Sequence, residues 1–165
     1  MGWNYRLPEF NAAIALAQLE RIDELIALRA RSADLFINAM SECGYLIPQL
    51  VPQGYTNSYY TLGAIYEGKD AIDVSWEDFR KAYIEAGGDG IYAAWSVPYL
   101  EPVIAERKFV KSCPWVYNDV EYKKGLCPVA ENIQQKMMQF KTNYRDLKLA
   151  RIKSEILRKV IKNFK

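Results

Sequence analysis

Residues 2–29 read GWNYRLPEFNAAIALAQLERIDELIALR and place a polar and aromatic cluster directly before a long helical pattern. Pro8 and Glu9 suit a first helical turn, because that turn leaves amide hydrogens unpaired and favours a negative charge. From Phe10 to about Met40, apolar residues recur at helical spacing with acidic residues between them. The pattern predicts one helix over residues 10–40, roughly 50 Å long if straight. A helix of that length in a small domain is expected to bend or to bridge to another body.

The middle of the sequence alternates between strand and helix patterns. Residues 58–66, SYYTLGAIY, are rich in aromatic and β-branched side chains and predict a strand. Ser75 is a suitable N-cap for a helix that ends at Gly87 and Gly88. These glycines are better explained as a helix stop than as a phosphate-binding loop, since no Lys-Ser/Thr pair follows them. Residues 90–95, GIYAAW, predict a second short strand.

The remaining segments complete an α+β pattern. Residues 44–57 indicate an irregular connection or a short strand, and residues 108–124 an exposed loop around Cys113 and Trp115. Helices are predicted over residues 127–140 and 144–163. The apolar stripe expected on the last helix consists of Leu149, Ile152, Ile156 and Val160. The predicted fold has helices on one face of a two- to three-stranded sheet.

The sequence divides into three expected regions. Residues 1–43 hold the long helix and the motif before it, residues 44–144 a small α+β domain, and residues 145–165 a basic amphipathic helix. That last region has eight Lys or Arg and two Asp or Glu residues, a net charge of +6. Such a helix either docks on the domain through its apolar stripe or binds an acidic partner or nucleic acid. Docking is the favoured interpretation, because the apolar spacing is what a docked helix needs.

Composition excludes several classes of function. The chain has no His, so a Ser-His or Cys-His mechanism is excluded within it. Its three Cys are widely spaced, which argues against a zinc site or disulfide framework and favours the cytoplasm. No apolar run approaches the ~20 residues of a membrane span. The formal net charge of +2 gives no global attraction to nucleic acid or membrane.

The string of residues 2–29 resembles, nearly position by position, a segment of the DegT/DnrJ/EryC1/StrS sugar aminotransferases. NSYYTLGAIYEG, SWEDFRKAYIEAGGDGIYAAWSVPYLEP and GLCPVAENIQQKMMQF are similar to later segments of that family, so the resemblance spans residues 2–144. It implies the small C-terminal domain of the aspartate-aminotransferase fold (fold type I). It also implies part of a pyridoxal-phosphate (PLP) enzyme that aminates keto-sugars, usually nucleotide-linked, in amino-sugar and polysaccharide biosynthesis.

The same resemblance implies roles for a few residues. Asn4 matches the Asn that reaches across a dimer to the phosphate of the neighbour's PLP, which an amide donor suits. Arg6, with Tyr5, is expected to meet an anionic group of the cofactor or substrate. Trp95 and Tyr99 fall in a substrate loop that commonly carries a His in the family. No catalytic or metal-binding residue is expected in this chain.

Partners follow from where the family keeps its cofactor. The Schiff-base lysine and the cofactor cradle lie in a large domain before the segment that this chain resembles, so the isolated chain is expected to be inactive and to hold no PLP covalently. The expected partners are that large domain or a partner subunit, and a second copy bound through residues 2–40; neither membrane nor nucleic acid is expected. The alternative is a stand-alone interaction module that binds an acidic partner or nucleic acid through the basic C-terminal helix.

Overall fold

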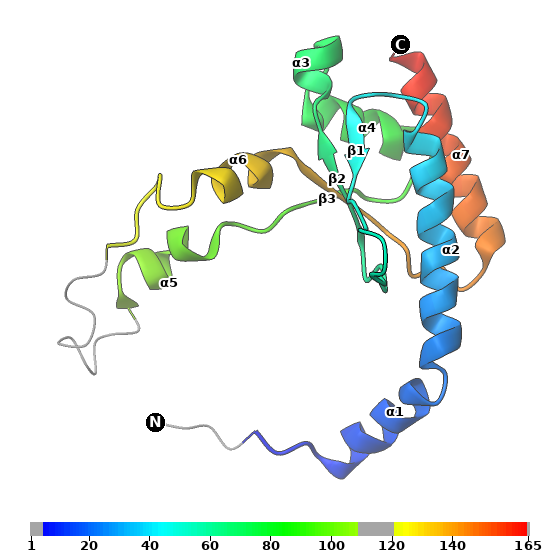
Figure 1. Cartoon of the computed structure of the whole chain (residues 1–165), viewed down its shortest axis with the longest axis vertical. Coiled ribbons are helices and arrows are strands. Elements are labelled where there is room, and N and C mark those ends of the chain that lie inside the picture. The colour runs from blue at the N-terminus through cyan, green and yellow to red at the C-terminus, as the bar shows by residue number, and fades with distance from the viewer. Residues whose placement is uncertain (1–4, 109–120, 165) are drawn as a thin grey trace.

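The computed structural model describes residues 5–108 and 121–164, which form a body of helices and sheet with two projecting arms (Figure 1). The elements in chain order are α1 (Glu9–Leu19), α2 (Ile22–Met40), β1 (Leu46–Pro48), β2 (Leu62–Tyr66), α3 (Gly68–Ile72), α4 (Trp76–Glu85), β3 (Tyr92–Ala93), a 3₁₀ turn η1 (Pro98–Leu100), α5 (Pro102–Ala105), α6 (Pro128–Lys136), β4 (Met137–Phe140) and α7 (Leu147–Asn163). One arm is α1, and the other carries α5 and α6.

The sheet has four strands in the order β1-β2-β4-β3, and all neighbours are antiparallel. This is more than the two or three strands predicted, because β4 occupies residues that were expected to continue a helix. The helix predicted over 127–140 ends at Lys136, and the chain enters the strand at Met137 without a loop. Pairing with β2, which sets Leu62 opposite Phe140, outweighs the helical spacing of the local sequence.

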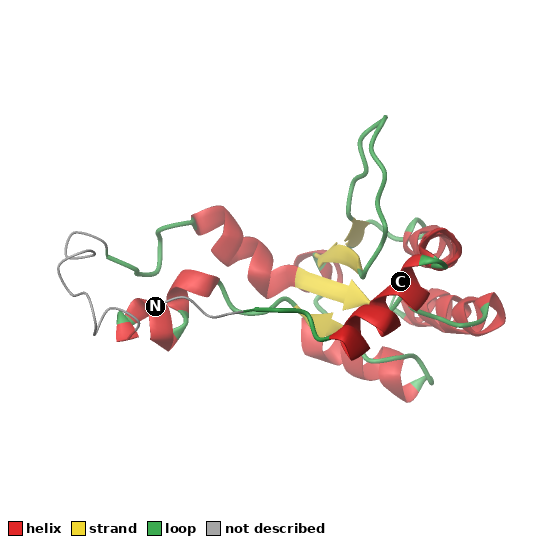
Figure 2. Ribbon diagram, turned by 90° about the horizontal axis from the view of Figure 1, so that it is seen from below, coloured by secondary structure: helices red, strands yellow, loops and turns green. Residues whose placement is uncertain are grey.

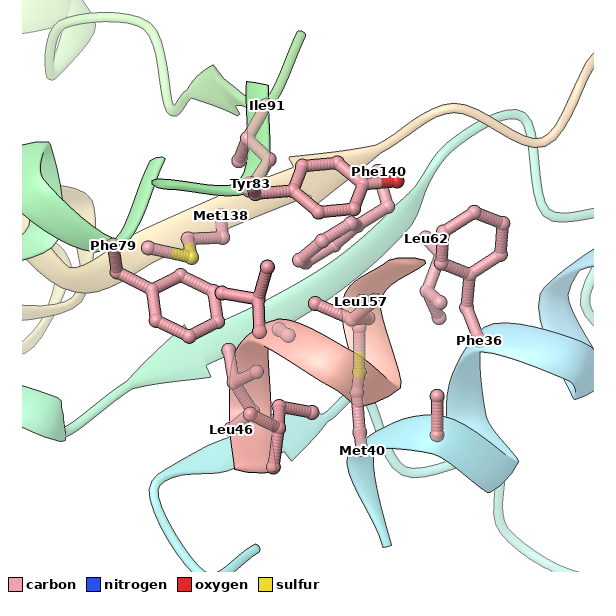
Figure 3. Packing of buried hydrophobic residues seen from close by; sticks show 14 of the residues in the cluster. Phe36, Met40, Leu46, Leu62, Phe79, Tyr83, Ile91, Met138, Phe140 and Leu157 are labelled. Atoms are coloured by element: carbon pink, nitrogen blue, oxygen red, sulfur yellow. The ribbon is translucent and has the colours of Figure 1, made fainter. Parts of the chain in front are cut away.

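The core lies on one face of this sheet, as predicted. Along β2 the side chains of Leu62, Ala64 and Tyr66 are buried, and those between them are less so. Helices α2, α4 and α7 contribute the other side of the core (Figure 3). The side chains labelled there are Phe36, Met40, Leu46, Leu62, Phe79, Tyr83, Ile91, Met138, Phe140 and Leu157. Burial on one face only leaves the opposite face of the sheet to the arms and to solvent.

Helices α2 and α7 run side by side in the same direction (Figure 1). Small residues are buried on both helices, among them Ala33 on α2 and Ala150 and Ser154 on α7. The docked-helix interpretation of the basic segment is thus confirmed. The predicted stripe is partly wrong, because Leu149 and Ile152 are 44% and 56% exposed. The buried face of α7 includes the small residues Ala150 and Ser154 together with Leu157, Val160 and Ile161. Small side chains let two helix backbones approach closely.

Two of the basic side chains of α7 are also engaged within the chain. Arg158 Nε forms an ion pair with Glu42, just beyond the end of α2, and Lys153 Nζ donates to the Gly87 carbonyl at 2.7 Å. These contacts direct part of the positive charge inward. They give no support to the alternative function as a polyanion-binding helix.

The single helix predicted over residues 10–40 is wrong in one respect, because it breaks at Glu20 and Arg21. The Arg21 amide bonds to the Gln18 carbonyl, a tighter turn than the α-helix makes. The two parts differ in packing, since α1 has no buried residue whereas α2 buries five. The expected bend is therefore present, and it separates a docked helix from an undocked one.

Local signals around α4 are confirmed. Ser75 Oγ accepts a hydrogen bond from the Asp78 amide at 3.0 Å, which caps the helix. At the other end Gly87 has φ +91°, a left-handed conformation that glycine adopts without strain, and the helix stops there as expected.

Candidate functional site

The predicted site residues lie on separate arms. Tyr5, which is 89% exposed, and the exposed Arg6 precede α1, whereas Trp95 and Tyr99 lie between β3 and α5 (Figure 1). Asn4 lies outside the described residues, as does most of the predicted 108–124 loop with its Cys113 and Trp115. Within the described chain, the structure does not assemble the two groups into one site.

Tyr99 is held within its own arm. Its hydroxyl donates to Glu131 Oε1 and accepts from the Cys127 amide at 3.0 Å, while Glu131 also accepts from the Gly125 amide at 2.7 Å. Burial, reinforced by the Glu131 bond, raises the pKa of Tyr99 to about 12, and the same bond lowers the pKa of Glu131. The network ties the loop before α6 to the segment before α5.

An apolar cavity of about 660 Å³ lies beside this network. Its lining residues are Val97, Pro98, Tyr99, Val103, Ile104, Tyr122, Cys127 and Ala130. The polar side-chain atoms among them are the phenols of Tyr99 and Tyr122 and the thiol of Cys127, and the Tyr99 phenol is already bonded to Glu131. This cavity suits an apolar group rather than a charged substrate.

Trp95 belongs to a different and more polar cavity, of about 520 Å³. The lining residues are Arg29, Tyr60, Thr61, Tyr92, Trp95, Gln139, Lys141, Thr142 and Asn143. They come from α2, β3, β4 and three loops, which lie before β2, after β3 and after β4, so only the folded chain brings them together. Tyr60 stands at the base of the long loop between β1 and β2, which projects from the sheet in Figure 2.

A third cavity, of about 510 Å³, adjoins the 520 Å³ cavity at Arg29 and Asn143, which line both. The lining residues are Gln18, Arg21, Glu24, Leu25, Leu28, Arg29, Asn143, Tyr144 and Arg145. We call the two together the Arg29 groove. Its one carboxylate, Glu24, pairs with Arg21 at 3.4 Å, so the other cations give the groove a positive balance.

Arg29 is positioned by several contacts. Its Nη1 donates to the Tyr60 carbonyl at 2.8 Å and to Thr142 Oγ1 at 3.4 Å, and its guanidinium carbon lies 5.5 Å from the Tyr60 ring centroid. Thr142 Oγ1 in turn donates to the Tyr59 carbonyl at 2.6 Å. The guanidinium is thus fixed between α2, β4 and the loop that carries Tyr60.

Sequence reasoning identified Trp95 but missed Arg29, Tyr60 and Lys141. Arg29 closes the string quoted at the start, where it reads as one more charge on a helix, and Tyr60 reads as part of a strand. The only available signal was the aromatic pair at 59 and 60, which ordinary strand propensity explains equally well.

The described residues do not fit covalently bound PLP. Such a site needs a lysine amine for the imine and a carboxylate for the pyridinium nitrogen. Lys141 is the lysine of the Arg29 groove, but the cavity it shares with Trp95 has no carboxylate among its lining residues. Lys136 bonds to Glu67 at 2.7 Å, which raises the pKa of its amine and keeps it protonated. Neither of these two lysines therefore offers the unpaired amine and the separate carboxylate that covalent PLP needs.

Across residues 5–108 and 121–164, no helix is both long and apolar enough to span a bilayer. Within the same ranges, no three His, Cys, Asp or Glu side chains come close enough to hold a metal ion.

Comparison with known proteins gives a consistent result. The model of the DegT/DnrJ/EryC1/StrS aminotransferase family matches residues 1–157. The match reaches well into α7, which corrects the limit of 144 drawn from the resemblance and places most of the basic helix within the family.

Several solved structures are similar to the chain in fold. The aminotransferase from Psychrobacter cryohalolentis has a TM-score of 0.75 at 19% identity, covering 99% of this chain and 41% of its own. A DegT DnrJ EryC1 StrS aminotransferase from Brucella abortus has a TM-score of 0.68 at 16% identity, covering 99% and 37%. Helicobacter pylori PseC, an aminotransferase involved in pseudoaminic acid biosynthesis, has a TM-score of 0.67 at 13% identity, covering 99% and 40%. The chain thus spans about two fifths of the length of these proteins.

Proposed function

The chain belongs to the DegT/DnrJ/EryC1/StrS aminotransferase family, and on that premise we propose that it is the small C-terminal part of a fold type I, PLP-dependent aminotransferase. The proposed substrate is a nucleotide-linked keto-sugar in amino-sugar and cell-surface polysaccharide biosynthesis in the cytoplasm. The observation that carries the proposal is the family match over residues 1–157. The similar folds of larger aminotransferases support it.

In this proposal the chain binds and orients ligands, and the imine-forming lysine comes from residues outside it. Asn4 contacts the PLP phosphate across a subunit interface, and Arg6 and Tyr5 contact the anionic part of the substrate. Trp95 and Tyr99 contribute from the other arm. The 88% exposure of Trp95 supports its part, because so large an exposed ring is available to a ligand.

The proposed partner surface is α1 with the residues before it. Phe10 and Leu19 are 74% and 60% exposed, and α1 has no buried residue. By contrast, α2 already buries residues such as Ala33 and Phe36 within the chain. The interface proposed for residues 2–40, with a large domain or a second copy, is therefore concentrated before the break at Arg21.

We expect the chain to self-associate through α1 when no large domain is present. Replacing both Phe10 and Leu19 with serine should weaken the dimer at least about a hundredfold, because two apolar side chains no longer leave water. Sedimentation equilibrium measures the dissociation constant. The control is Val129→Ser, which removes a 70% exposed apolar side chain from α6 instead. A wild-type chain that stays monomeric at high concentration would contradict the proposed interface.

The proposed function predicts aminotransferase activity only when the chain is combined with a PLP-binding large domain. The chain is produced alone and together with the polypeptide encoded immediately upstream of it, and the amination of a nucleotide-linked keto-sugar by glutamate is measured in the presence of PLP. We expect no turnover and no aldimine absorbance from the chain alone, since the described residues do not fit covalent PLP.

Two outcomes would overturn this proposal. One is an aldimine that borohydride fixes to a lysine of this chain, and Lys141→Met tests the lysine of the groove directly. The other is the absence of any PLP-binding domain encoded upstream or nearby, which would leave the chain without an enzyme to complete.

A further inference from the structure

We propose that the outer face of α7 binds the corner between α1 and α2 of a second copy of this chain. The outer face consists of Lys148, Leu149, Arg151 and Ile152. The corner consists of Leu19, Glu20, Ile22 and Asp23. This inference rests on the self-association proposed above and names the surface that receives the corner. It depends neither on PLP nor on the aminotransferase reaction.

The outer face of α7 is both apolar and basic. Leu149 and Ile152 are 44% and 56% exposed, and they lie outside the face that α7 buries in the core. Lys148 and Arg151 are also exposed, and neither forms an ion pair with a carboxylate in the part of the chain that the structure describes. An apolar pair flanked by two cations is suited to an apolar partner with acidic neighbours.

The acidic residues of α7 and its cap are occupied by other contacts. Asp146 accepts a hydrogen bond from the Lys148 amide at 2.8 Å, which caps the helix. Glu155 forms an ion pair with Arg158, one turn further along α7. The acidic partner of the outer face must therefore come from another surface.

The corner between α1 and α2 has the complementary character. Leu19 and Ile22 are 60% and 42% exposed, on either side of the break between the two helices. Glu20 and Asp23 are exposed as well, and neither forms an ion pair with a cation within residues 5–108 and 121–164. A second copy of the chain therefore supplies the apolar and acidic groups that the outer face lacks.

The two surfaces also match in the order of their residues. In the corner an acidic residue follows each apolar one, in the string LERID of residues 19–23. On α7 a basic residue precedes each apolar one, in the string KLARI of residues 148–152. When the two strings run in opposite directions, each apolar residue faces an apolar one and each acid faces a base. The match therefore requires an antiparallel contact.

An antiparallel contact suits a twofold dimer. Helices α2 and α7 run side by side in the same direction, and Gln18, Arg21 and Arg145 line one cavity, so the corner and the start of α7 lie at the same end of the pair (Figure 1). A twofold axis perpendicular to these helices reverses their direction in the second copy. The corner of each copy then meets the outer face of the other, so the contact forms twice.

Sedimentation equilibrium on the full chain and two charge-reversed variants tests this contact. One variant combines Lys148→Glu with Arg151→Glu, and the other combines Glu20→Lys with Asp23→Lys. Each should weaken its own dimer about a hundredfold, because attraction becomes repulsion in both copies of the contact. An equimolar mixture of the two variants should dimerise about as tightly as the wild type, because every contact again joins acid to base.

A matched control separates this contact from the effect of net charge. Lys123→Glu with Lys124→Glu changes the net charge by the same amount in the loop before α6, and it should leave the dissociation constant unchanged. Raising sodium chloride from about 0.05 to about 0.5 M should weaken the wild-type dimer about tenfold, because salt screens exposed charges. Circular dichroism establishes that each variant is folded.

The outcomes separate this inference from the proposed function. A dimer that Phe10→Ser with Leu19→Ser disrupts, but that both charge-reversed variants leave intact, overturns the inference and keeps the α1 interface. A monomeric chain overturns both, and its binding to phosphatidylserine vesicles through Lys148 and Arg151 would assign the outer face to a lipid surface instead. Restored dimerisation in the mixture supports the inference even where the combined preparation has no aminotransferase activity, and the proposed function alone then fails.

Discussion

Replacing Phe140 with alanine should lower the free energy of unfolding by about 3–5 kcal/mol. Phe140 is 2% exposed, on the central strand β4, and its ring centroid lies 5.9 Å from that of Phe36 and 6.3 Å from that of Tyr83 (Figure 3). The substitution opens a cavity between α2, α4 and the sheet, where these rings cannot close in fully. Since small domains have a total stability of about 5–15 kcal/mol, the loss is a large share of the whole.

Urea denaturation followed by far-ultraviolet circular dichroism measures this effect, and the chain supplies a matched control. Phe10→Ala makes the same chemical change on α1, where the side chain is 74% exposed, and at protein concentrations below the dimer dissociation constant it should alter the free energy of unfolding by less than about 0.5 kcal/mol. Equal losses in the two variants would contradict the described packing, because they would show that α1 is buried in the free chain.

Raising the pH above 10 should unfold the protein cooperatively. Tyr45, Tyr66, Tyr83 and Tyr144 are buried, and burial raises the pKa of each, that of Tyr66 to about 12. In the unfolded chain these phenols ionise near pH 10, so above that pH the unfolded state loses protons that the folded state retains. The stabilisation is thus complete below pH 10 and is lost as the pH rises toward 12. The loss is at most about 1.4 kcal/mol per phenol per pH unit.

Thermal melts at increasing pH, with tyrosinate absorbance recorded in parallel, test this prediction. Tyr45→Phe is the informative variant, because the Tyr45 hydroxyl makes weak hydrogen bonds, one of 3.4 Å to the Ile161 carbonyl and one with the Cys43 thiol. The variant removes one ionising group with little loss of stability. The slope of the free energy of unfolding against pH should then correspond to about one fewer proton released on unfolding than in the wild type. Ionisation of all tyrosines near pH 10 with the helical signal intact would contradict the raised pKa values.

The parts of the fold that the sequence predicted are those fixed by neighbouring residues. The cap at Ser75 and the stop at Gly87 are local signals, and both were confirmed. Strand β4 was missed because its sequence also fits a helix, and only its pairing with β2 makes it a strand. The buried face of α7 was likewise predicted only in part, since small residues such as Ala150 reveal their role only once α2 lies against them.

The candidate site was also predicted only in part, because most of its residues meet through contacts between segments that are distant in sequence. Trp95 was identified through a resemblance, and the structure places it at a cavity with Arg29 and Lys141, which are far from it in sequence. Neither cation has a local pattern that marks it, because a charged residue on a helix or after a strand is usually solvated. The antiparallel pairing of β3 with β4 sets Tyr92 opposite Gln139, and these two residues line the same cavity as Trp95 and Lys141.

Helix α6 passes directly into strand β4, so the junction fixes the distance between the arm that carries α6 and the sheet. Lys136 ends the helix and Met137 begins the strand, so no linker absorbs an added residue. One insertion there would shift the strand by one position and turn Met138 and Phe140 away from the core. An added residue between the helix and the strand is therefore not expected to be tolerated. The distance between the Tyr99 network and the core therefore depends on the number of residues in α6 and β4, and no flexible linker between them can change it.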